Sequence, residues 1–258
     1  MIGKRGAYMA KQVPGKSRRF IFGFLLVIST VLIACAVYAG DYYRADETAC
    51  LALVSDASVS VEQQENMVVF RPETLSSVGF IFYPGGKVEY TSYAPLMREL
   101  AQRGVQCFLL KMPCNLAVLD VNAADSLPEQ YSEIQQWYIG GHSLGGSMAA
   151  SYAAKHPDTL DGLVLLAAYS TEGLTSSGTE VLSLYGTEDG VLDFEKYEKY
   201  RKNLPADTIE VILGGGNHAC FGSYGSQKGD GIAELSGEDQ TVQTAEAVAE
   251  FIVERVQR

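Results

Sequence analysis

A serine in a glycine-rich turn, Ser143, is followed along the chain by the acids Glu188, Asp189 and Asp193 and then by His218. A serine hydroxyl is a weak nucleophile until a neighbouring histidine removes its proton, and a carboxylate can hold that histidine in the required tautomer. Such a set attacks an acyl carbon and forms an acyl-enzyme, which water then hydrolyses. The five cysteines form no CxxC pair and lack the Cys/His spacing of a zinc site. We therefore expect serine-dependent acyl chemistry with no metal and no other cofactor.

The turn around Ser143 has the sequence GHSLG over residues 141–145. It follows an apolar run at 137–140 and precedes small residues typical of a helix at 144–155. A serine between a strand and a helix lies on a sharp, strained turn that projects its hydroxyl, and side chains in place of Gly141 and Gly145 would collide with the neighbouring elements. This context, more than the pattern itself, predicts a nucleophile elbow.

The elements that would position these residues alternate between strand and helix. Continuous Val, Ile, Leu and Phe runs are typical of strands covered on both faces, and apolar residues at helical spacing lie between them. We expect an α/β fold with a mostly parallel sheet of about 7–8 strands and helices on both faces. The predicted strands are 67–71, 78–83, 105–111, 137–141, 163–168, 181–185 and 208–213, and the predicted helices are 92–103, 123–136, 144–155, 194–203 and 241–257.

Three segments resemble the α/β-hydrolase family, and within it the compact lidless group related to dienelactone hydrolases (the fold-5 type). They are residues 82–87 (FYPGGK), 140–146 (GGHSLGG) and 216–219 (GNHA). The resemblance covers about residues 65–258 and implies the α/β-hydrolase fold. It also implies a triad in the order serine, acid, histidine, each at the carboxyl end of a strand.

The resemblance indicates which acid completes the triad. The family pattern places the acid three residues after a glycine that ends the second strand beyond the nucleophile, and this favours Asp189 after Gly186. Glu188 remains a competitor because it is the neighbouring residue. Asp193 precedes a predicted helix, where the role of an N-cap explains it.

His218 is the candidate base, because the other two histidines have different explanations. His142 lies inside the elbow, with its side chain expected to point away from Ser143. His156 stands before a proline at a helix end, where it can interact with the helix dipole. The resemblance further implies an oxyanion hole made by the backbone N–H groups of Leu144 and Gly86.

The expected substrate site is open, because only ten residues separate Ser170 from Val181 and leave no room for a cap domain. Its expected borders are 87–91, 112–116, 169–174 and 218–224. Such a site favours a small or flexible acyl substrate, and a carboxylic ester is our choice. A membrane-tethered lipase or thioesterase and a non-catalytic binding module with the hydrolase fold remain alternatives. The candidate substrate-binding residues are Lys87, Tyr169, Phe221 and Tyr224.

Residues 20–39 contain no charge and no proline, and a helix of that length would cross a hydrocarbon core of roughly 30 Å. Six Lys or Arg precede this run and acids follow it, so the positive-inside rule places the N-terminus in the cytoplasm and the catalytic domain outside the cell membrane. The alternatives are a secretory signal cut after Ala39 and a lipoprotein signal cut before Cys35. The expected organisation is a basic segment (1–19), a single transmembrane signal anchor (20–39), a connector (40–64) and the hydrolase domain (65–258).

The part of the chain beyond the apolar run is strongly acidic. Residues 40–258 hold 14 basic and 31 acidic residues, a net charge of −17, so nucleic acid is not an expected partner. Cys114 and Cys220 each follow a segment that ends near the expected site, and a disulfide between them is a hypothesis for an exported domain. The sequence does not determine the oligomeric state.

Overall fold

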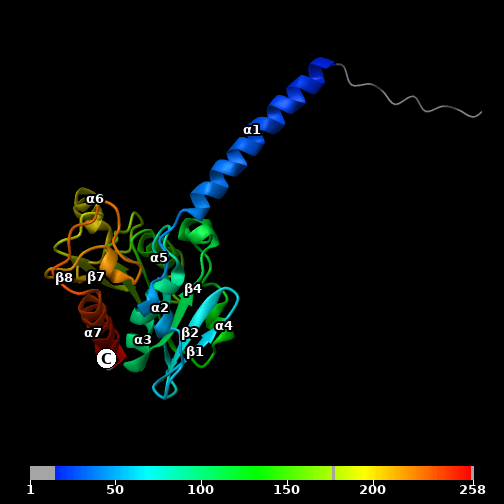
Figure 1. The fold of residues 1–258 in the computed structure, drawn as a ribbon. Coiled ribbons are helices and arrows are strands. Elements are labelled where there is room, and N and C mark those ends of the chain that lie inside the picture. The colour runs from blue at the N-terminus through cyan, green and yellow to red at the C-terminus, as the bar shows by residue number, and fades with distance from the viewer. Residues whose placement is uncertain (1–14, 176–177, 257–258) are drawn as a thin grey trace, which may run out of the picture. The chain divides into compact units, whose positions relative to one another are not determined.

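The computed structural model describes residues 15–175 and 178–256 (Figure 1). Residues 1–14, which make up most of the expected basic segment, lie outside the described residues. The chain divides into two compact units, of which the first ends at Asp41 and the second begins at Tyr42. The first unit contains helix α1 (Gly15–Gly40), whose stretch Phe20–Gly40 has a mean hydropathy of 2.8. This stretch is long and apolar enough to cross a membrane, as an anchor or a signal sequence would.

In the second unit, the described residues form one sheet of eight strands in the order β1-β2-β4-β3-β5-β6-β7-β8. The strands from β4 to β8 in this order are parallel, and β1 and β2 add an antiparallel edge. This mixed α/β sheet agrees with the predicted fold class. The strands are β1 (Val59–Gln63), β2 (Met67–Pro72), β3 (Val78–Tyr83), β4 (Gln106–Leu110), β5 (Gln136–His142), β6 (Gly162–Leu166), β7 (Glu180–Gly186) and β8 (Ile209–Leu213).

Residues 40–64, expected as a connector, contribute two elements to this second unit: helix α2 (Glu47–Ala52) and the edge strand β1. Tyr43 is also fixed to it, because its N–H donates to the carbonyl of Lys87 at 2.8 Å. The apolar residues of β1 are Val59 and Val61, which alternate with polar residues. Of these two, Val59 is buried and Val61 is partly exposed. So short an edge strand carries little hydrophobic signal.

The main helices of this unit match four of the five predicted ones. The predicted helix at 123–136 is wrong, because only residues 127–130 are α-helical there. Leu127, Tyr131 and Ile134 have helical spacing and are buried, but the backbone leaves the helix at Tyr131 with φ −119° and ψ 63°. The helices are α3 (Ala94–Gln102), α4 (Leu127–Gln130), α5 (Leu144–Lys155), α6 (Phe194–Tyr200) and α7 (Gly237–Val256).

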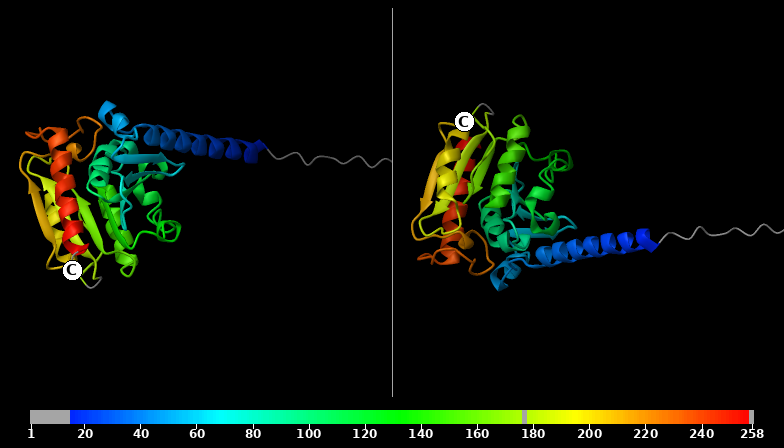
Figure 2. Two further views of the ribbon diagram at one scale, coloured as in Figure 1. Left: turned by 90° about the horizontal axis from the view of Figure 1, so that it is seen from below. Right: turned by 90° about the horizontal axis from the view of Figure 1, so that it is seen from above.

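Helices cover both faces of the sheet, and alternate strand residues point to opposite layers. Phe80 and Phe82 pack in the layer that contains α3 and α7, whereas Ile81 and Tyr83 pack in the layer that contains α5. Figure 2 shows α7 lying along one face of the sheet. Because the strands from β3 to β8 are parallel, the segments that follow β5, β7 and β8 emerge at one edge of the sheet. These segments carry Ser143, Asp189 and His218.

Candidate active site

Ser143 lies at the sharp turn between β5 and α5. Its backbone has φ 52° and ψ −121°, in a region that residues other than glycine rarely adopt. The turn is held by a hydrogen bond from the Ser143 N–H to the carbonyl of Leu166 at 2.9 Å. The structure thus stores backbone strain at the residue expected to be the nucleophile.

The glycines beside Ser143 are required by close backbone contacts. A Cβ atom at Gly145 would lie 2.2 Å from the carbonyl oxygen of Tyr83, and one at Gly141 would lie 2.6 Å from the same atom. Distances this short exclude any side chain. The collisions expected at both positions are therefore present, and they explain why the turn begins and ends with glycine.

Asp189 and His218 form a buried pair after β7 and β8. The His218 Nδ1 atom lies 2.8 Å from Asp189 Oδ2, and the two side chains are 2% and 0% exposed. The other carboxylate oxygen accepts the N–H groups of Val191 and Leu192 at 2.8 and 2.7 Å. An ionised carboxylate accepts but does not donate, so the hydrogen-bond pattern assigns the proton of a neutral His218 to Nδ1. The Nε2 atom is then the basic nitrogen.

The two competing acids make other contacts. Glu188 accepts a hydrogen bond from the Thr187 hydroxyl at 3.1 Å, and Asp193 caps α6 by accepting the N–H of Lys196 at 3.0 Å. The N-cap predicted for Asp193 is therefore present. Asp189 is the acid that the structure brings to His218.

Ser143 and His218 line the same cavity, which has a volume of about 240 Å³. The Nε2 atom of His218 is buried and has no hydrogen-bond partner among the described residues. A buried polar atom without a partner is costly, and in an active site it marks a group that is free to accept a proton. The rest of the lining comes from Leu144, Ser147, residues 167–169 and residues 191–193.

The two residues expected to hold the oxyanion lie against each other. A Cβ atom at Gly86 would be 2.9 Å from Cδ2 of Leu144. Leu144 is the first residue of α5, and N–H groups in the first turn of a helix have no acceptor within the helix. The loop of Gly86 therefore lies next to the N-terminus of α5.

A buried tyrosine holds the beginning of that loop. The Tyr93 hydroxyl accepts the N–H of Gly85 at 3.1 Å and lies 2.8 Å from Nδ1 of His142. Burial raises the pKa of Tyr93, so its hydroxyl keeps its proton. Sequence reasoning missed Tyr93, since its spacing is equally typical of a residue in the helix core.

His142 is a buried neutral side chain that packs against His218. Burial, together with the nearby His218, lowers its pKa well below the usual value of 6.5. Its ring centroid lies 4.4 Å from that of His218 and 5.6 Å from that of Phe221. His142 therefore contacts both the Tyr93 hydroxyl and the ring of His218.

Of the four candidate substrate-binding residues, Tyr169 lines the cavity of Ser143 and His218. Phe221 and Tyr224 do not form its apolar walls as expected, because they are 2% and 7% exposed and pack in the core near Tyr93. Lys87 is also outside the described lining, and its N–H donates to the carbonyl of Asn115. The apolar walls are instead Ala167, Ala168, Val191 and Leu192.

The disulfide between Cys114 and Cys220 is not formed, because both thiols are free. Cys114 is exposed, whereas Cys220 is half-buried and lies two residues after His218. Within residues 15–175 and 178–256, no group of three or more His, Cys, Asp or Glu side chains is arranged to hold a metal ion.

The chain belongs to the alpha/beta hydrolase family, whose sequence model matches residues 79–242. The matched region begins in β3 and includes the elbow, Asp189 and His218. By family the protein is a hydrolase, and the expected family resemblance is confirmed. No curated protein matches the chain in a sequence comparison.

Solved structures with similar folds include two hydrolases. A CIB-like hydrolase from Thermoplasma acidophilum matches with a TM-score of 0.54 and 16% identity, over 75% of this chain and 100% of that one. Est1E from Butyrivibrio proteoclasticus matches with a TM-score of 0.55 and 14% identity, over 78% of this chain and 100% of Est1E. Est1E with bound ferulic acid matches with a TM-score of 0.57 and 14% identity, over 80% and 99% of the two chains. At these identities the similarity shows a shared fold.

Proposed function

We propose that the protein is a serine hydrolase that cleaves a carboxylic ester through Ser143, His218 and Asp189. The observation that carries the proposal is the buried His218 side chain, whose Nδ1 contacts Asp189 while Nε2 has no described partner and shares a cavity with Ser143. His218 would take the Ser143 proton at Nε2 as the hydroxyl attacks the acyl carbon. Asp189 would stabilise the imidazolium that forms.

The remaining steps use the same groups. The N–H groups of Leu144 and Gly86 would stabilise the oxyanion of the tetrahedral intermediate, and each such donor contributes about 3 to 4 kcal/mol to transition-state binding. The imidazolium of His218 would then protonate the leaving alcohol. A water molecule, activated by the same Nε2 atom, would hydrolyse the acyl-enzyme and restore the Ser143 hydroxyl.

The experiment that tests the triad uses the full chain in detergent. We expect turnover of p-nitrophenyl acetate, covalent labelling by a fluorophosphonate probe, and loss of both in Ser143→Ala. Ser151→Ala is the matched control, because Ser151 lies on the same helix but does not line the cavity in the described structure. If the unmutated chain reacts with neither reagent, it is a binding module that kept the fold, and the proposed activity is wrong.

The size of the cavity supports a short acyl group. Ala167, Val191 and Leu192 line a space of about 240 Å³ beside Ser143, which a long acyl chain would overfill. We expect kcat/KM to be highest for acetyl to butyryl esters and to fall for octanoyl and longer esters. A rise with chain length would favour a lipase, and a preference for acyl-thiol substrates of matched length would favour a thioesterase.

We further propose that residues 20–39 anchor the protein as a single transmembrane helix, with residues 1–19 cytoplasmic and the hydrolase domain outside. The apolar stretch Phe20–Gly40 and the six preceding positive charges support this arrangement. Intact mass of the membrane fraction tests cleavage, because a secreted form or a lipoprotein would lack the first residues. Protease added to intact cells should digest the hydrolase domain, and its protection would contradict the proposed orientation.

A further inference from the structure

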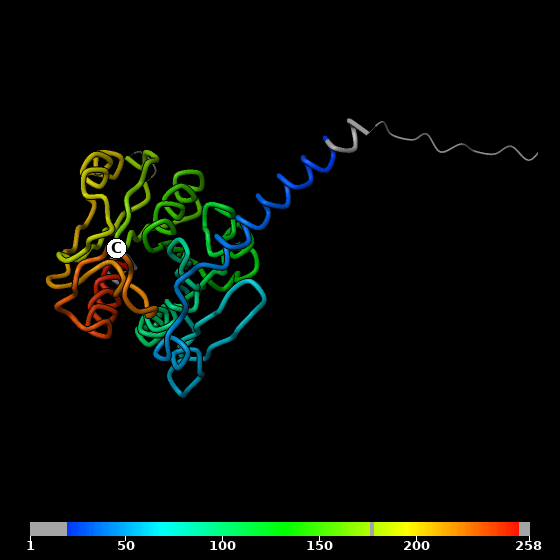
Figure 3. The backbone as a smooth tube through the Cα atoms, turned by 45° about the horizontal axis from the view of Figure 1, so that its top comes forward, coloured from blue at the N-terminus to red at the C-terminus, as the bar shows by residue number. Residues whose placement is uncertain are grey.

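The long loop after β8 is rich in glycine and serine, and it carries an acid, Asp230, whose carboxylate contacts the segment of His218, the proposed general base. This loop spans residues 214–236, between β8 and α7, and is drawn in orange tones in Figure 3. Asp230 lies in its second half. Oδ2 of Asp230 accepts the N–H of Ala219 at 2.8 Å, and Oδ1 accepts that of Gly190 at 3.0 Å. Oδ1 also lies 3.3 Å from the N–H of His218 and 2.9 Å from that of Gly231.

Three of these four donors belong to the two segments that supply the proposed acid and base. Gly190 directly follows Asp189, and the other two donors are His218 and its neighbour Ala219. Gly190 lies outside the loop that carries Asp230, so this carboxylate also bonds the segment of Asp189 to the segment of His218. We propose that Asp230 is a positioning residue, which fixes the distance and orientation between Asp189 and His218.

The packing of the three segments explains why a carboxylate is needed there. They meet backbone to backbone: a Cβ atom at Gly231 would lie 2.0 Å from the carbonyl oxygen of Glu188, and one at Gly186 would lie 2.1 Å from that of Gly216. Since glycines at these contacts provide no interlocking side chains, hydrogen bonds must define how the segments are spaced. A carboxylate can accept several N–H groups at once, and its bonds are stronger than those of a neutral acceptor.

A second side chain, that of Gln240, also bonds to the segment that carries His218. Gln240, on α7 and fully buried, accepts the N–H of Asn217 at 3.0 Å and donates to its carbonyl at 2.8 Å. This contact fixes Asn217 against α7, but it does not reach the segment of Asp189. The Thr187 side chain also joins the two segments, because its Oγ1 accepts the N–H of Gly215 at 2.8 Å, but both residues lie before the pair in their segments. Asp230 accepts the N–H groups of His218 itself and of Gly190, which directly follows Asp189.

The inference rests on the proposed function and predicts an effect on turnover more than on substrate binding. Asp230 contacts backbone groups and does not line the cavity of Ser143 in the described structure. In Asp230→Asn, an NH2 group would replace one carboxylate oxygen and oppose at least one of the N–H donors. We expect kcat to fall roughly 10- to 100-fold, since a small misplacement of catalytic groups has effects of this size. KM should change by less than about twofold, because uniform binding is retained.

The test compares Asp230→Asn with Glu234→Gln in the full chain in detergent. Glu234 is exposed on the same loop. Its variant therefore removes one negative charge but leaves the hydrogen bonds of the Asp230 carboxylate in place. Kinetics with p-nitrophenyl acetate are combined with hydrogen exchange measured by mass spectrometry. We expect faster exchange in peptides that cover 186–192 and 214–221 of Asp230→Asn, with α3 unchanged and with Glu234→Gln like the parent.

Two results would overturn the inference. One is an Asp230→Asn protein with parental kcat and parental exchange in both segments. The other is an increase in exchange throughout the hydrolase domain, α3 included, which would make Asp230 a general stability residue. If the parent itself has no esterase activity, the proposed function is wrong. The hydrogen-exchange comparison still decides whether Asp230 holds the segments of Asp189 and His218 together.

Discussion

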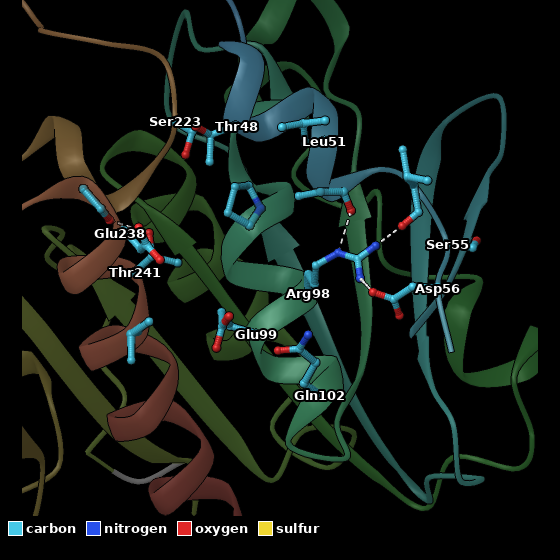
Figure 4. Close-up of a pocket in the computed structure, with 15 residues that line it drawn as sticks. Thr48, Leu51, Ser55, Asp56, Arg98, Glu99, Gln102, Ser223, Glu238 and Thr241 are labelled. Carbon is cyan, nitrogen blue, oxygen red and sulfur yellow. Dashed lines mark hydrogen bonds and ion pairs between the residues drawn. The ribbon is translucent and has the colours of Figure 1, made fainter. Parts of the chain in front are cut away.

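Two of the cavities in the described part of the hydrolase unit differ in how the polar groups of their side chains are bonded. The cavity between α2, α3 and α7 has a volume of about 510 Å³, against about 240 Å³ for the one that holds Ser143 and His218. In the larger cavity, the guanidinium of Arg98 donates to the carbonyls of Ala52 and Val54 and to the carboxylate of Asp56 (Figure 4). Each nitrogen of that guanidinium is thus occupied.

The smaller cavity leaves one nitrogen of its buried histidine without a partner. The Nδ1 atom of His218 contacts Asp189, whereas its Nε2 atom has no hydrogen-bond partner among the described residues. Satisfied polar groups stabilise a fold, whereas a group whose position is fixed and whose bonding capacity is incomplete can react. Cavity volume is therefore a poorer guide to this active site than the hydrogen bonds of its side chains.

Among the variants that test this contrast, Asp189→Asn is expected to have the largest effect on kcat. We expect kcat for p-nitrophenyl acetate to fall roughly 10⁴-fold, because an amide can donate to Nδ1 and stabilise the wrong histidine tautomer. Glu188→Gln is the control and should change kcat by less than about twofold. The reverse outcome would make Glu188 the acid and remove Asp189 from the mechanism.

Removing the hydroxyl that supports the oxyanion loop should have a smaller effect. In Tyr93→Phe, the N–H of Gly85 and Nδ1 of His142 both lose their partner. We expect kcat to fall roughly 10-fold and the free energy of unfolding to fall by about 1 to 3 kcal/mol, the cost of an unsatisfied buried polar group. Tyr185→Phe, on β7, is the control for loss of a tyrosine hydroxyl. Parental kcat in Tyr93→Phe would show that Gly85 needs no support.

A change in the larger cavity should affect stability alone. Arg98→Met removes the donor to Ala52 and Val54, and we expect the free energy of unfolding to fall by about 1 to 2 kcal/mol. The kcat value should remain within about twofold of the parent. Arg201→Met, in which a side chain that is 54% exposed is replaced, should change neither quantity. A large loss of turnover in Arg98→Met would break the contrast between the cavities.

The smallest expected effect is a pH dependence of stability from His142. Its pKa is lowered in the folded state by burial, so below the unfolded value of 6.5 the unfolded chain binds the extra proton. Stability should therefore be complete above this value and fall as the pH decreases, by under about 1 kcal/mol between pH 7.5 and about pH 6. Urea unfolding at both pH values measures it. His142→Asn should show a smaller pH dependence, and an unchanged dependence would assign the effect to other groups.

Residue patterns in short stretches of the sequence correctly predicted those elements that depend on a few neighbouring residues. Strand β5, the glycine turn and helix α5 occur where apolar, glycine and small residues predict them. The same reasoning failed at 123–136, because helical spacing of apolar residues does not require that the backbone between them be helical. It also missed β1, since an edge strand buries too few side chains to stand out.

The sequence by itself determined the elbow around Ser143, the family and the apolar stretch at 20–39, because each depends on residues adjacent in the chain. Only the tertiary structure brought Asp189 rather than Glu188 to His218, buried Phe221 and Tyr224 in the core, and turned Asp230 back onto both segments. Those outcomes depend on strand order and on contacts between residues distant in the chain, such as Gly190 and Asp230, which are 40 positions apart. Hydrogen bonds of this kind leave no periodic pattern in a sequence, since one side chain meets backbone groups whose own residue types are unconstrained.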